Sequence, residues 1–249
     1  MTSLHHKTAL VTGSARGIGR AIAERYAALG ANVVINYSTG QAQAREAVAA
    51  IEQAGGTALA VQADVAHAED VDRLFSSTLE RFGSLDIVVA NAGVELIAEP
   101  LLDISEADFD RLYSINARGT FLTLQRAARH VADNGRIIYI GSSSTAFPQP
   151  GMGGYSSSKI AGQLLVEVLS KEIGARGVTV NSILPTATDG AGVFTRGVPE
   201  DVAQLIQTIR PVKRMGTVDD VADAAEYLAG DLAGFVSGQH LLISGGAPA

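Results

Sequence analysis

The chain has 249 residues, a formal net charge of -7 at pH 7, 47% hydrophobic and 18% charged residues, and no cysteine. This hydrophobic content excludes an intrinsically disordered chain, and the lack of cysteine excludes disulfide frameworks and thiolate metal sites. The acidic balance is the wrong sign for binding a nucleic-acid backbone over a large surface, so we expect no nucleic-acid partner.

The chain length and the absence of an obvious linker predict a single domain over residues 1–249. The N-terminus contains no apolar signal segment, and nowhere is there an uninterrupted apolar run of about 18 residues. We therefore expect a soluble cytoplasmic protein with no membrane partner. Adjacent histidines, His5 and His6, lack a third ligand, so we expect no metal site.

Seven apolar segments rich in β-branched residues recur along the chain and predict β-strands. Their hydrophobic residues are continuous rather than alternating, which indicates strands buried on both faces, as in a parallel sheet covered by helices. The predicted strands are residues 8–11, 33–35, 59–61, 87–90, 137–140, 178–184 and 241–243.

Between these strands, Ala, Leu and Val recur at three- and four-residue spacing with charge on the opposite face, which predicts amphipathic helices. The alternation of strand and helix predicts right-handed βαβ units and a Rossmann-type doubly wound α/β sheet with helices on both faces. Such a sheet binds its ligands beyond the carboxyl ends of its strands. The predicted helices are residues 17–29, 41–54, 68–82, 107–132 and 153–175.

The last quarter of the chain is less regular. Acidic pairs at residues 200–201 and 219–220 precede apolar helical segments, as suits acids at helix N-termini. Residues 185–199 contain three glycines and no strong periodicity. A loop of this length is usually functional or mobile, so we predict a mobile substrate loop here.

A glycine-rich turn, residues 12–19, joins the first predicted strand to the first predicted helix. A dinucleotide fold places its pyrophosphate at this turn, because glycines allow close approach and the helix N-terminus offers free N–H groups. The spacing is G-x-x-x-G-x-G rather than the general G-x-G-x-x-G, and the alternative is a turn that only packs the helix against the strand. The candidate cofactor-binding residues are Gly13, Ser14, Arg16, Gly17, Ile18 and Gly19.

The end of the second predicted strand bears on the choice of cofactor. An NAD site usually has an acidic residue roughly 20 residues beyond the glycine turn, whereas a 2′-phosphate requires an arginine. Residues 33–38 contain no acid, and the guanidinium of Arg16 can pair with the phosphate and stack on adenine. We therefore predict NADP(H), with Tyr37 and Ser38 at its site. If Arg16 is only a solvated surface residue, NAD(H) is the alternative.

Two later strand ends meet the same edge of the predicted sheet. Asp64 could accept a hydrogen bond from the adenine amino group or act as the N-cap of the next helix. Gly93 would let the backbone approach the adenosine ribose, or it is a plain turn glycine. The candidate cofactor-binding residues at these two strand ends are Asp64, Val65, Asn91, Ala92 and Gly93.

Tyr155 and Lys159 lie four residues apart at the start of a predicted helix, so their side chains share one face. A free tyrosine has a pKa of about 10, but a nearby cation favours the phenolate and lowers that pKa. The pair could then act as a general acid and base; the alternative is a solvated helix face.

Two more polar residues are candidates for the same chemistry. Ser142 follows the fifth predicted strand, where its hydroxyl could hold a substrate oxygen at Tyr155, although serines there are usually turn formers. Asn116 interrupts a helical pattern. Its side-chain amide could open the backbone ladder and hold a water behind Lys159.

In these motifs the sequence resembles the short-chain dehydrogenase/reductase family over nearly its whole length. The resemblance implies an NAD(P)-dependent oxidoreductase with a seven-stranded parallel sheet that assembles as a homotetramer. It rests on Thr12-Gly-x-x-x-Gly17-x-Gly19, Asn91-Ala92-Gly93, Asn116, Ser142, Tyr155-x-x-x-Lys159 and Gly238-Gln239…Ser244-Gly245-Gly246.

The resemblance also implies a role for each catalytic residue. Tyr155 would be the acid/base, and Lys159 would lower its pKa and hold the nicotinamide ribose. Ser142 would bind the carbonyl or hydroxyl oxygen of the substrate, and Asn116 would keep a proton-relay water.

Within the family, the end of the second strand and Arg16 resemble the branch of 3-oxoacyl-ACP reductases, glucose dehydrogenases and carbonyl reductases that use NADP. One departure is clear. The family usually has Pro-Gly after the sixth strand and then a Thr that holds the nicotinamide amide, but this chain is two residues shorter there. We assign the amide contact to Thr188, with Thr186 as the alternative and Pro185 beside them.

The predicted function is an NADP(H)-dependent interconversion of a carbonyl and an alcohol on a small molecule, as in a ketone or 3-oxoacyl reductase. The alternatives are a non-catalytic NADP-sensing module on the same fold and an NAD(P)-dependent sugar dehydrogenase. Residues 94–102, 145–154 and 185–199 would shape the pocket. Four side chains suggest that it is apolar, or pack a subunit contact instead: Phe147, Met152, Val193 and Phe194.

Overall fold

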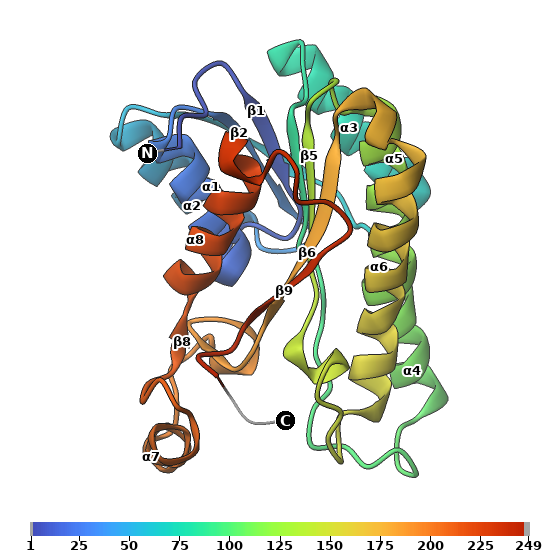
Figure 1. The fold of residues 1–249 in the computed structure, drawn as a ribbon, viewed down its shortest axis with the longest axis vertical. Coiled ribbons are helices and arrows are strands. Elements are labelled where there is room, and N and C mark those ends of the chain that lie inside the picture. The colour runs from blue at the N-terminus through green and yellow to red at the C-terminus, as the bar shows by residue number, and fades with distance from the viewer. Residues whose placement is uncertain (1, 247–249) are drawn as a thin grey trace.

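The computed structural model describes residues 2–246 and contains one sheet of seven parallel strands, in the order β3-β2-β1-β4-β5-β6-β9. All seven predicted strands are present, and the predicted doubly wound architecture is confirmed (Figure 1). The strands are β1 (Thr8–Val11), β2 (Asn32–Tyr37), β3 (Thr57–Gln62), β4 (Ile87–Ala90), β5 (Arg136–Ile140), β6 (Thr179–Pro185) and β9 (His240–Ile243).

Helices cover both faces of this sheet because alternate strand residues point to opposite sides. Ala9 and Val11 of β1 join one hydrophobic cluster, and Leu10 between them joins the other. The first cluster lies under α1 (Gly17–Ala28), α2 (Gln41–Gln53) and α8 (Val218–Ala229), and the second under α3 (Ala68–Phe82), α5 (Thr120–His130) and α6 (Gly153–Glu172).

Helices α1 and α8 pack side by side although they come from opposite ends of the chain (Figure 1). The guanidinium of Arg25 on α1 donates to the Glu226 carboxylate on α8 at 2.9 Å. The buried phenol of Tyr26 donates to the backbone oxygen of Ala225 at 2.9 Å. The first and last thirds of the sequence therefore share one layer of the core.

Burial is complete in the central strands but not at the edges of the sheet. Every residue of β1, β4, β5 and β6 is buried, whereas β3 and β9 are partly exposed along their length. The expectation that all seven strands are buried on both faces is thus wrong for these two. Each of these two strands pairs with one neighbour only, because it lies at an edge of the sheet, and no strand covers its outer side.

The chain order reverses between β1 and β4, which is where a doubly wound sheet binds its ligand. The side chain of Thr12, just after β1, accepts hydrogen bonds from the backbone N–H groups of Asn91 and Ala92 at 3.0 and 3.1 Å. The Asn91 amide donates back to the oxygens of Thr12 and Gly13 at 2.8 and 3.0 Å. These bonds join the carboxyl ends of β1 and β4.

The predicted helix over residues 107–132 has an irregular centre. It consists of α4 (Glu106–Leu112), a π-helix (Tyr113–Gly119) and α5, with Asn116 buried inside the π-helix. The wider turns of the π-helix thus lie at Asn116, where the sequence predicted that a side-chain amide could open the backbone hydrogen-bond ladder of the helix.

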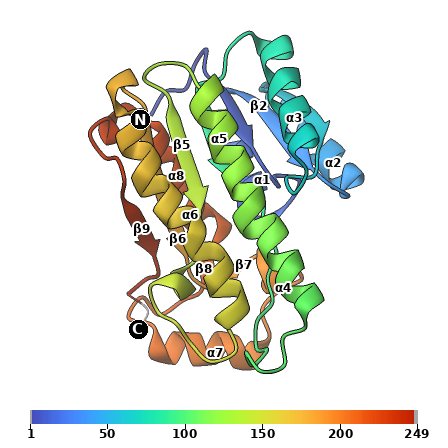
Figure 2. The same cartoon turned by 90° about the vertical axis from the view of Figure 1, so that its right-hand side faces the viewer.

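Residues 185–199 pass the carboxyl ends of the strands, and α4 and α7 (Glu200–Ile209) lie at that same end of the molecule (Figures 1 and 2). Within this segment, β7 (Thr188–Asp189) pairs in parallel with β8 (Gly216–Thr217), a short ladder that the sequence did not predict.

The predicted acidic helix starts are confirmed, since α7 begins at Glu200 and Asp220 completes a capping box on α8. Within residues 2–246, no helix combines the length and apolar character needed to cross a bilayer.

Candidate active site

The glycine turn packs so closely against the loop after β4 that side chains are excluded. A Cβ on Gly13 would lie 2.9 Å from the Ala92 Cα, and one on Gly19 would lie 2.5 Å from the Asn91 Nδ2. Gly13 and Gly17 also have φ values of +61° and +60°. No side chain caps the N-terminus of α1, so its first-turn N–H groups are left for an anion. The turn therefore fits a dinucleotide pyrophosphate.

Asn36, at the end of β2, holds the start of this turn. Its Oδ1 accepts a hydrogen bond from the Gly13 N–H at 3.0 Å, and its backbone oxygen accepts one from the Ser14 N–H at 2.9 Å. The Ser14 hydroxyl donates to the Val11 oxygen at 2.7 Å. Gly13 and Ser14 thus shape the turn through their own hydrogen bonds. The sequence signal for Asn36 was a single amide inside an apolar strand.

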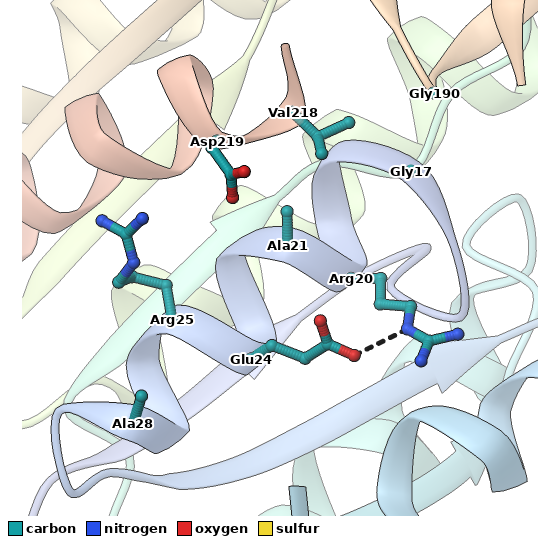
Figure 3. Close-up of a pocket in the computed structure, with 9 residues that line it drawn as sticks. All are labelled: Gly17, Arg20, Ala21, Glu24, Arg25, Ala28, Gly190, Val218 and Asp219. Carbon is teal, nitrogen blue, oxygen red and sulfur yellow. Dashed lines mark hydrogen bonds and ion pairs between the residues drawn. The ribbon is translucent and has the colours of Figure 1, made fainter. Parts of the chain in front are cut away.

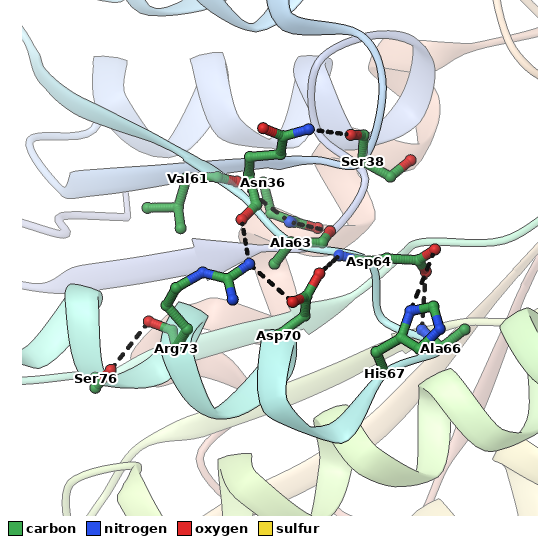
Figure 4. Close-up of polar contacts among 11 residues, drawn as sticks. Asn36, Ser38, Val61, Ala63, Asp64, Ala66, His67, Asp70, Arg73 and Ser76 are labelled. Carbon is green, nitrogen blue, oxygen red and sulfur yellow. Dashed lines mark hydrogen bonds and ion pairs between the residues drawn. The ribbon is translucent and has the colours of Figure 1, made fainter.

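The residues predicted to surround a 2′-phosphate differ in exposure. Arg16 and Ser38 are exposed, whereas Tyr37 is buried in the hydrophobic cluster under α1 and α2. The Ser38 backbone oxygen accepts a hydrogen bond from the Gln62 side chain at 2.9 Å (Figure 4). Residues 36–38 carry no carboxylate that would repel a phosphate. The contact of Arg16 and Ser38 with a 2′-phosphate stays a prediction.

Asp64 is not the N-cap of α3, so that alternative is wrong. His67 is the N-cap, and Asp64 instead closes a tight turn before it, its Oδ1 accepting from the Ala66 N–H at 3.0 Å (Figure 4). Asp70, from the first turn of α3, accepts from the Asp64 N–H at 2.8 Å. The Asp64 carboxylate stays partly exposed, while Val65 is buried.

Tyr155 lies in the first turn of α6 and is buried beside Ser142. Ser142 is the N-cap of a short 3-10 helix and accepts a hydrogen bond from the Ser144 N–H at 3.2 Å. Its hydroxyl also shares a hydrogen bond of 2.9 Å with the Ser144 hydroxyl, and Ser142 lowers the pKa of the Tyr155 phenol. Ser142 is thus both the turn former and the neighbour of the tyrosine that the sequence predicted.

The pKa of Tyr155 is shifted in the direction opposite to our expectation. Burial raises the pKa of Tyr155, and the Glu95 carboxylate raises it further, against the smaller effect of Ser142. Burial lowers the pKa of Lys159 from 10.5 to about 8. The charge of Lys159 does not offset the effect of burial on the pKa of Tyr155. Tyr155 therefore keeps its proton at neutral pH, as a proton donor must.

Tyr139 on β5 positions Lys159 and was not predicted. The Lys159 Nζ donates to the Ile140 oxygen at 3.0 Å and lies 5.5 Å from the centre of the Tyr139 ring. The Tyr139 hydroxyl donates to the Lys159 backbone oxygen at 2.9 Å. A Cβ on Gly162 would overlap the same ring. The available sequence signal for Tyr139 was a tyrosine inside an apolar strand, because a buried tyrosine hydroxyl needs a hydrogen-bond partner.

Asn116, Lys159 and Gly93 converge behind the tyrosine. A Cβ on Gly93 would lie 2.9 Å from the Lys159 Nζ and 3.1 Å from the Asn116 Oδ1. The Asn116 side chain accepts from the Val94 N–H at 2.8 Å and donates to the Val94 oxygen and the Ser158 hydroxyl, both at 2.9 Å. Both amide hydrogens are thus engaged. The Oδ1 atom has two lone pairs and accepts this one hydrogen bond from Val94, so its second lone pair could accept from a water.

The two threonines assigned to the nicotinamide amide follow Pro185, which ends β6. Thr188 is buried, and its hydroxyl donates to the Thr186 oxygen at 2.7 Å. Thr186 is half-buried, with its hydroxyl 3.4 Å from an Arg210 nitrogen. The geometry does not choose between the two, and both contacts stay predictions.

The three segments predicted to shape the pocket contact one another. The Glu99 N–H donates to the Gly151 oxygen at 3.2 Å, which joins residues 94–102 to residues 145–154. The Val193 N–H donates to the Glu95 carboxylate at 2.9 Å, which joins residues 94–102 to residues 185–199. Glu95 was not predicted as a site residue; its only signal was its position just beyond Gly93.

A separate groove of about 500 Å³ lies on the outer face of α1 (Figure 3). Gly17 of the glycine turn and Gly190 border it, and an Arg20–Glu24 ion pair of 2.7 Å lies along it. Its lining includes none of the four predicted catalytic residues. The groove is thus distinct from the site around Tyr155.

Comparison with known proteins gives matches over essentially the whole chain. A family model described as Enoyl-(Acyl carrier protein) reductase matches residues 13–248. The 3beta-hydroxysteroid dehydrogenase 1 of Eggerthella lenta is 39% identical over 246 residues, which cover 98% of this chain and 94% of that protein.

Solved structures agree. A dehydrogenase/reductase from Sinorhizobium meliloti is 41% identical with a TM-score of 0.93, over 99% of this chain and 97% of the other. A short chain dehydrogenase from Burkholderia cenocepacia, solved in complex with NADP, is 38% identical with a TM-score of 0.90, over 99% of each chain.

Proposed function

The chain belongs to the short-chain dehydrogenase/reductase family, and we propose that it is an NADP(H)-dependent enzyme that interconverts a ketone and an alcohol. The observation that carries the proposal is the buried phenol of Tyr155, which Ser142 influences and which lies one helical turn from Lys159. A phenol that keeps its proton suits the reductive direction.

The preference for NADP(H) over NAD(H) is supported by charge. Arg16 is exposed at the start of α1, and no carboxylate follows β2 where an NAD site has one. The similar enzyme from Burkholderia cenocepacia is in complex with NADP. Residues 15–19 would hold the pyrophosphate, and Arg16 with Ser38 would hold the 2′-phosphate.

When bound, NADPH would supply a hydride to the carbonyl carbon. Ser142 would donate a hydrogen bond to the substrate oxygen, and Tyr155 would deliver its phenolic proton to that same oxygen. The hydride and the proton together convert the ketone to the alcohol. Burial of Tyr155 and Ser142 keeps bulk water from competing for this proton.

Lys159 and Asn116 would restore the proton. With a pKa of about 8, Lys159 is largely protonated at pH 7 and stabilises the phenolate that Tyr155 becomes. The free lone pair on the Asn116 Oδ1 would bind the relay water behind Lys159.

A ketone or 3-oxoacyl substrate is supported by the partly exposed apolar side chains of Phe147, Met152, Val193 and Phe194 near the site. A sugar dehydrogenase would instead line its pocket with hydrogen-bonding side chains. A non-catalytic NADP sensor would have no use for the buried Tyr155, Ser142 and Lys159 set.

The test is a screen of the purified protein with NADPH or NADH against ketones, 3-oxoacyl thioesters and sugars, read at the nicotinamide absorbance. NADPH oxidation with ketones supports the proposal. Turnover restricted to sugars with an oxidised cofactor identifies the sugar dehydrogenase, and binding of NADPH without turnover identifies the sensor.

We propose a homotetramer as the working form. On α6, Ile160, Leu164 and Val168 recur at four-residue intervals and are 48, 63 and 44% exposed, and Phe121 of α5 is 43% exposed. Helices α5 and α6 lie side by side (Figure 2). An apolar patch of this kind marks a protein interface. Light scattering should give four times the chain mass, and Leu164→Glu should lower it; a monomeric wild-type protein would contradict the assembly.

A further inference from the structure

Glu95 is held in a fixed position by the backbone of residues 192–193. Its carboxylate accepts a hydrogen bond from the Val193 N–H at 2.9 Å, across a sequence separation of 98 residues. A Cβ on Gly192 would overlap both carboxylate oxygens, and Gly192 has a φ of +53°. The turn at Gly192 therefore wraps around this one carboxylate.

The backbone before Glu95 is tied to the catalytic residues. Asn116 holds both the N–H and the oxygen of Val94, and Gly93 lies against the Lys159 Nζ. The negative charge of Glu95 reaches Tyr155 and Lys159, since it raises the pKa of both. Glu95 is exposed, so its charge also faces whatever enters from solvent.

The charges of the three pocket segments are mostly negative. Residues 145–154 contain no charged residue, and residues 94–102 contain Glu95 and Glu99. Residues 185–199 contain one acid, Asp189, and one base, Arg196. Of the acids, Glu95 is the one whose charge acts on the phenol and the amine.

We propose that Glu95 is a specificity-determining residue that disfavours anionic carbonyl substrates, so that the enzyme takes neutral ketones in preference to ketoacids. This inference rests on the proposed ketone reduction. A carboxylate or phosphate on a substrate held at Tyr155 would meet the negative field that Glu95 already exerts on the phenol, from a side chain tethered to the Val193 N–H. Because Glu95 is solvated, the effect is a moderate discrimination rather than an absolute barrier.

The test compares two substrates that differ in charge and by one methyl group, methyl 4-oxocyclohexanecarboxylate and 4-oxocyclohexanecarboxylate, with NADPH at pH 7. The comparison of wild type with variant cancels the effect of the methyl group. Wild-type kcat/KM should favour the ester. In Glu95→Gln the ester-to-acid ratio should fall roughly 3- to 10-fold through faster use of the anion. Gln keeps an oxygen to accept from Val193, so the turn stays tethered. Glu99→Gln, in the same segment, should leave the ratio unchanged.

The dependence of the ester-to-acid ratio on salt concentration gives a second readout. Raising the ionic strength should lower the wild-type ratio toward that of Glu95→Gln, while the ratio of the variant changes little. Wild-type turnover of the ester with equal ratios in the two proteins would overturn the role of Glu95 and leave the ketone reductase proposal standing. Failure of both proteins to reduce any ketone would instead remove the proposed function itself.

Discussion

The side-chain oxygen of Asn36 accepts a hydrogen bond from the Gly13 N–H at 3.0 Å, so an amide at the end of β2 fixes the turn that follows β1. The same side chain donates to the Ala63 oxygen at 3.0 Å, beyond the end of β3. One buried amide thus joins the ends of three neighbouring strands at the predicted adenine side of the cofactor site.

Asn36→Leu should weaken both the fold and the cofactor site. The Gly13 N–H and the Ala63 oxygen would lose their partner, and each unsatisfied buried group costs about 1–3 kcal/mol. Urea unfolding should show that loss, and NADPH affinity should fall with it. Asn32→Leu, at the partly exposed opposite end of β2, is the matched control and should change neither. Unchanged NADPH affinity in Asn36→Leu would contradict the positioning role.

Tyr155→Phe should abolish most turnover and leave cofactor binding intact. The ring is conserved and only the proton donor is lost, which typically costs about 100- to 10,000-fold in rate. NADPH fluorescence on binding checks the site, and single-turnover kinetics check the chemistry. Tyr227→Phe removes an exposed hydroxyl on α8 and should behave as wild type. Wild-type turnover in Tyr155→Phe would refute the mechanism.

Arg16→Ala should weaken NADPH binding far more than NADH binding. A charge-assisted hydrogen bond contributes about 1.5–3 kcal/mol, which corresponds to roughly 10- to 150-fold in affinity for the phosphorylated cofactor alone. Calorimetric titration with both cofactors measures the two losses separately. Equal losses would show that Arg16 does not contact the 2′-phosphate.

Lys159→Met should lose activity and gain stability. The fall of the Lys159 pKa from 10.5 to about 8 corresponds to roughly 3 kcal/mol. Because the folded pKa is the lower one, the unfolded chain binds more protons between these values, and the wild-type free energy of unfolding rises with pH there. The stability difference from Lys159→Met should therefore be largest below pH 8 and shrink towards pH 10.5. A difference that stays constant with pH would contradict the buried charge.

Gly162→Ala should destabilise the protein, since the added methyl group would overlap the Tyr139 ring. Overpacking of a tight core costs about 1–3 kcal/mol, and here it would also displace the helix that carries Lys159. Gly174→Ala is the matched control, because nothing lies within 4 Å of the position its Cβ would take. The control should be neutral or slightly stabilising; equal losses in both would contradict the contact.

The fold was predictable because its signals are local. Continuous β-branched runs indicated the seven strands, and three- and four-residue periodicity indicated the helices between them. What failed depends on neighbours rather than on sequence: β3 and β9 are partly exposed because they lie at the edges of the sheet. The β7–β8 ladder is two residues long on each side and leaves no periodicity to detect.

The site was predictable where chemistry demands a particular residue type, as for Tyr155, Lys159 and the glycine turn. Asn36, Tyr139 and Glu95 went unrecognised because each acts through a partner far away in the sequence. The pKa of Tyr155 was expected in the wrong direction, since the spacing to Lys159 is visible in the sequence but the depth of burial is not.

The pairing of α1 with α8 has a consequence for biosynthesis. Arg25 and its partner Glu226 are separated by 201 residues, which a ribosome adds in roughly 10–40 s at 5–20 residues per second. During that interval α1 lacks the contacts that it makes with α8 in the folded protein. This layer of the core therefore closes only after α8 has been synthesised, when about nine-tenths of the chain have already left the ribosome's active centre.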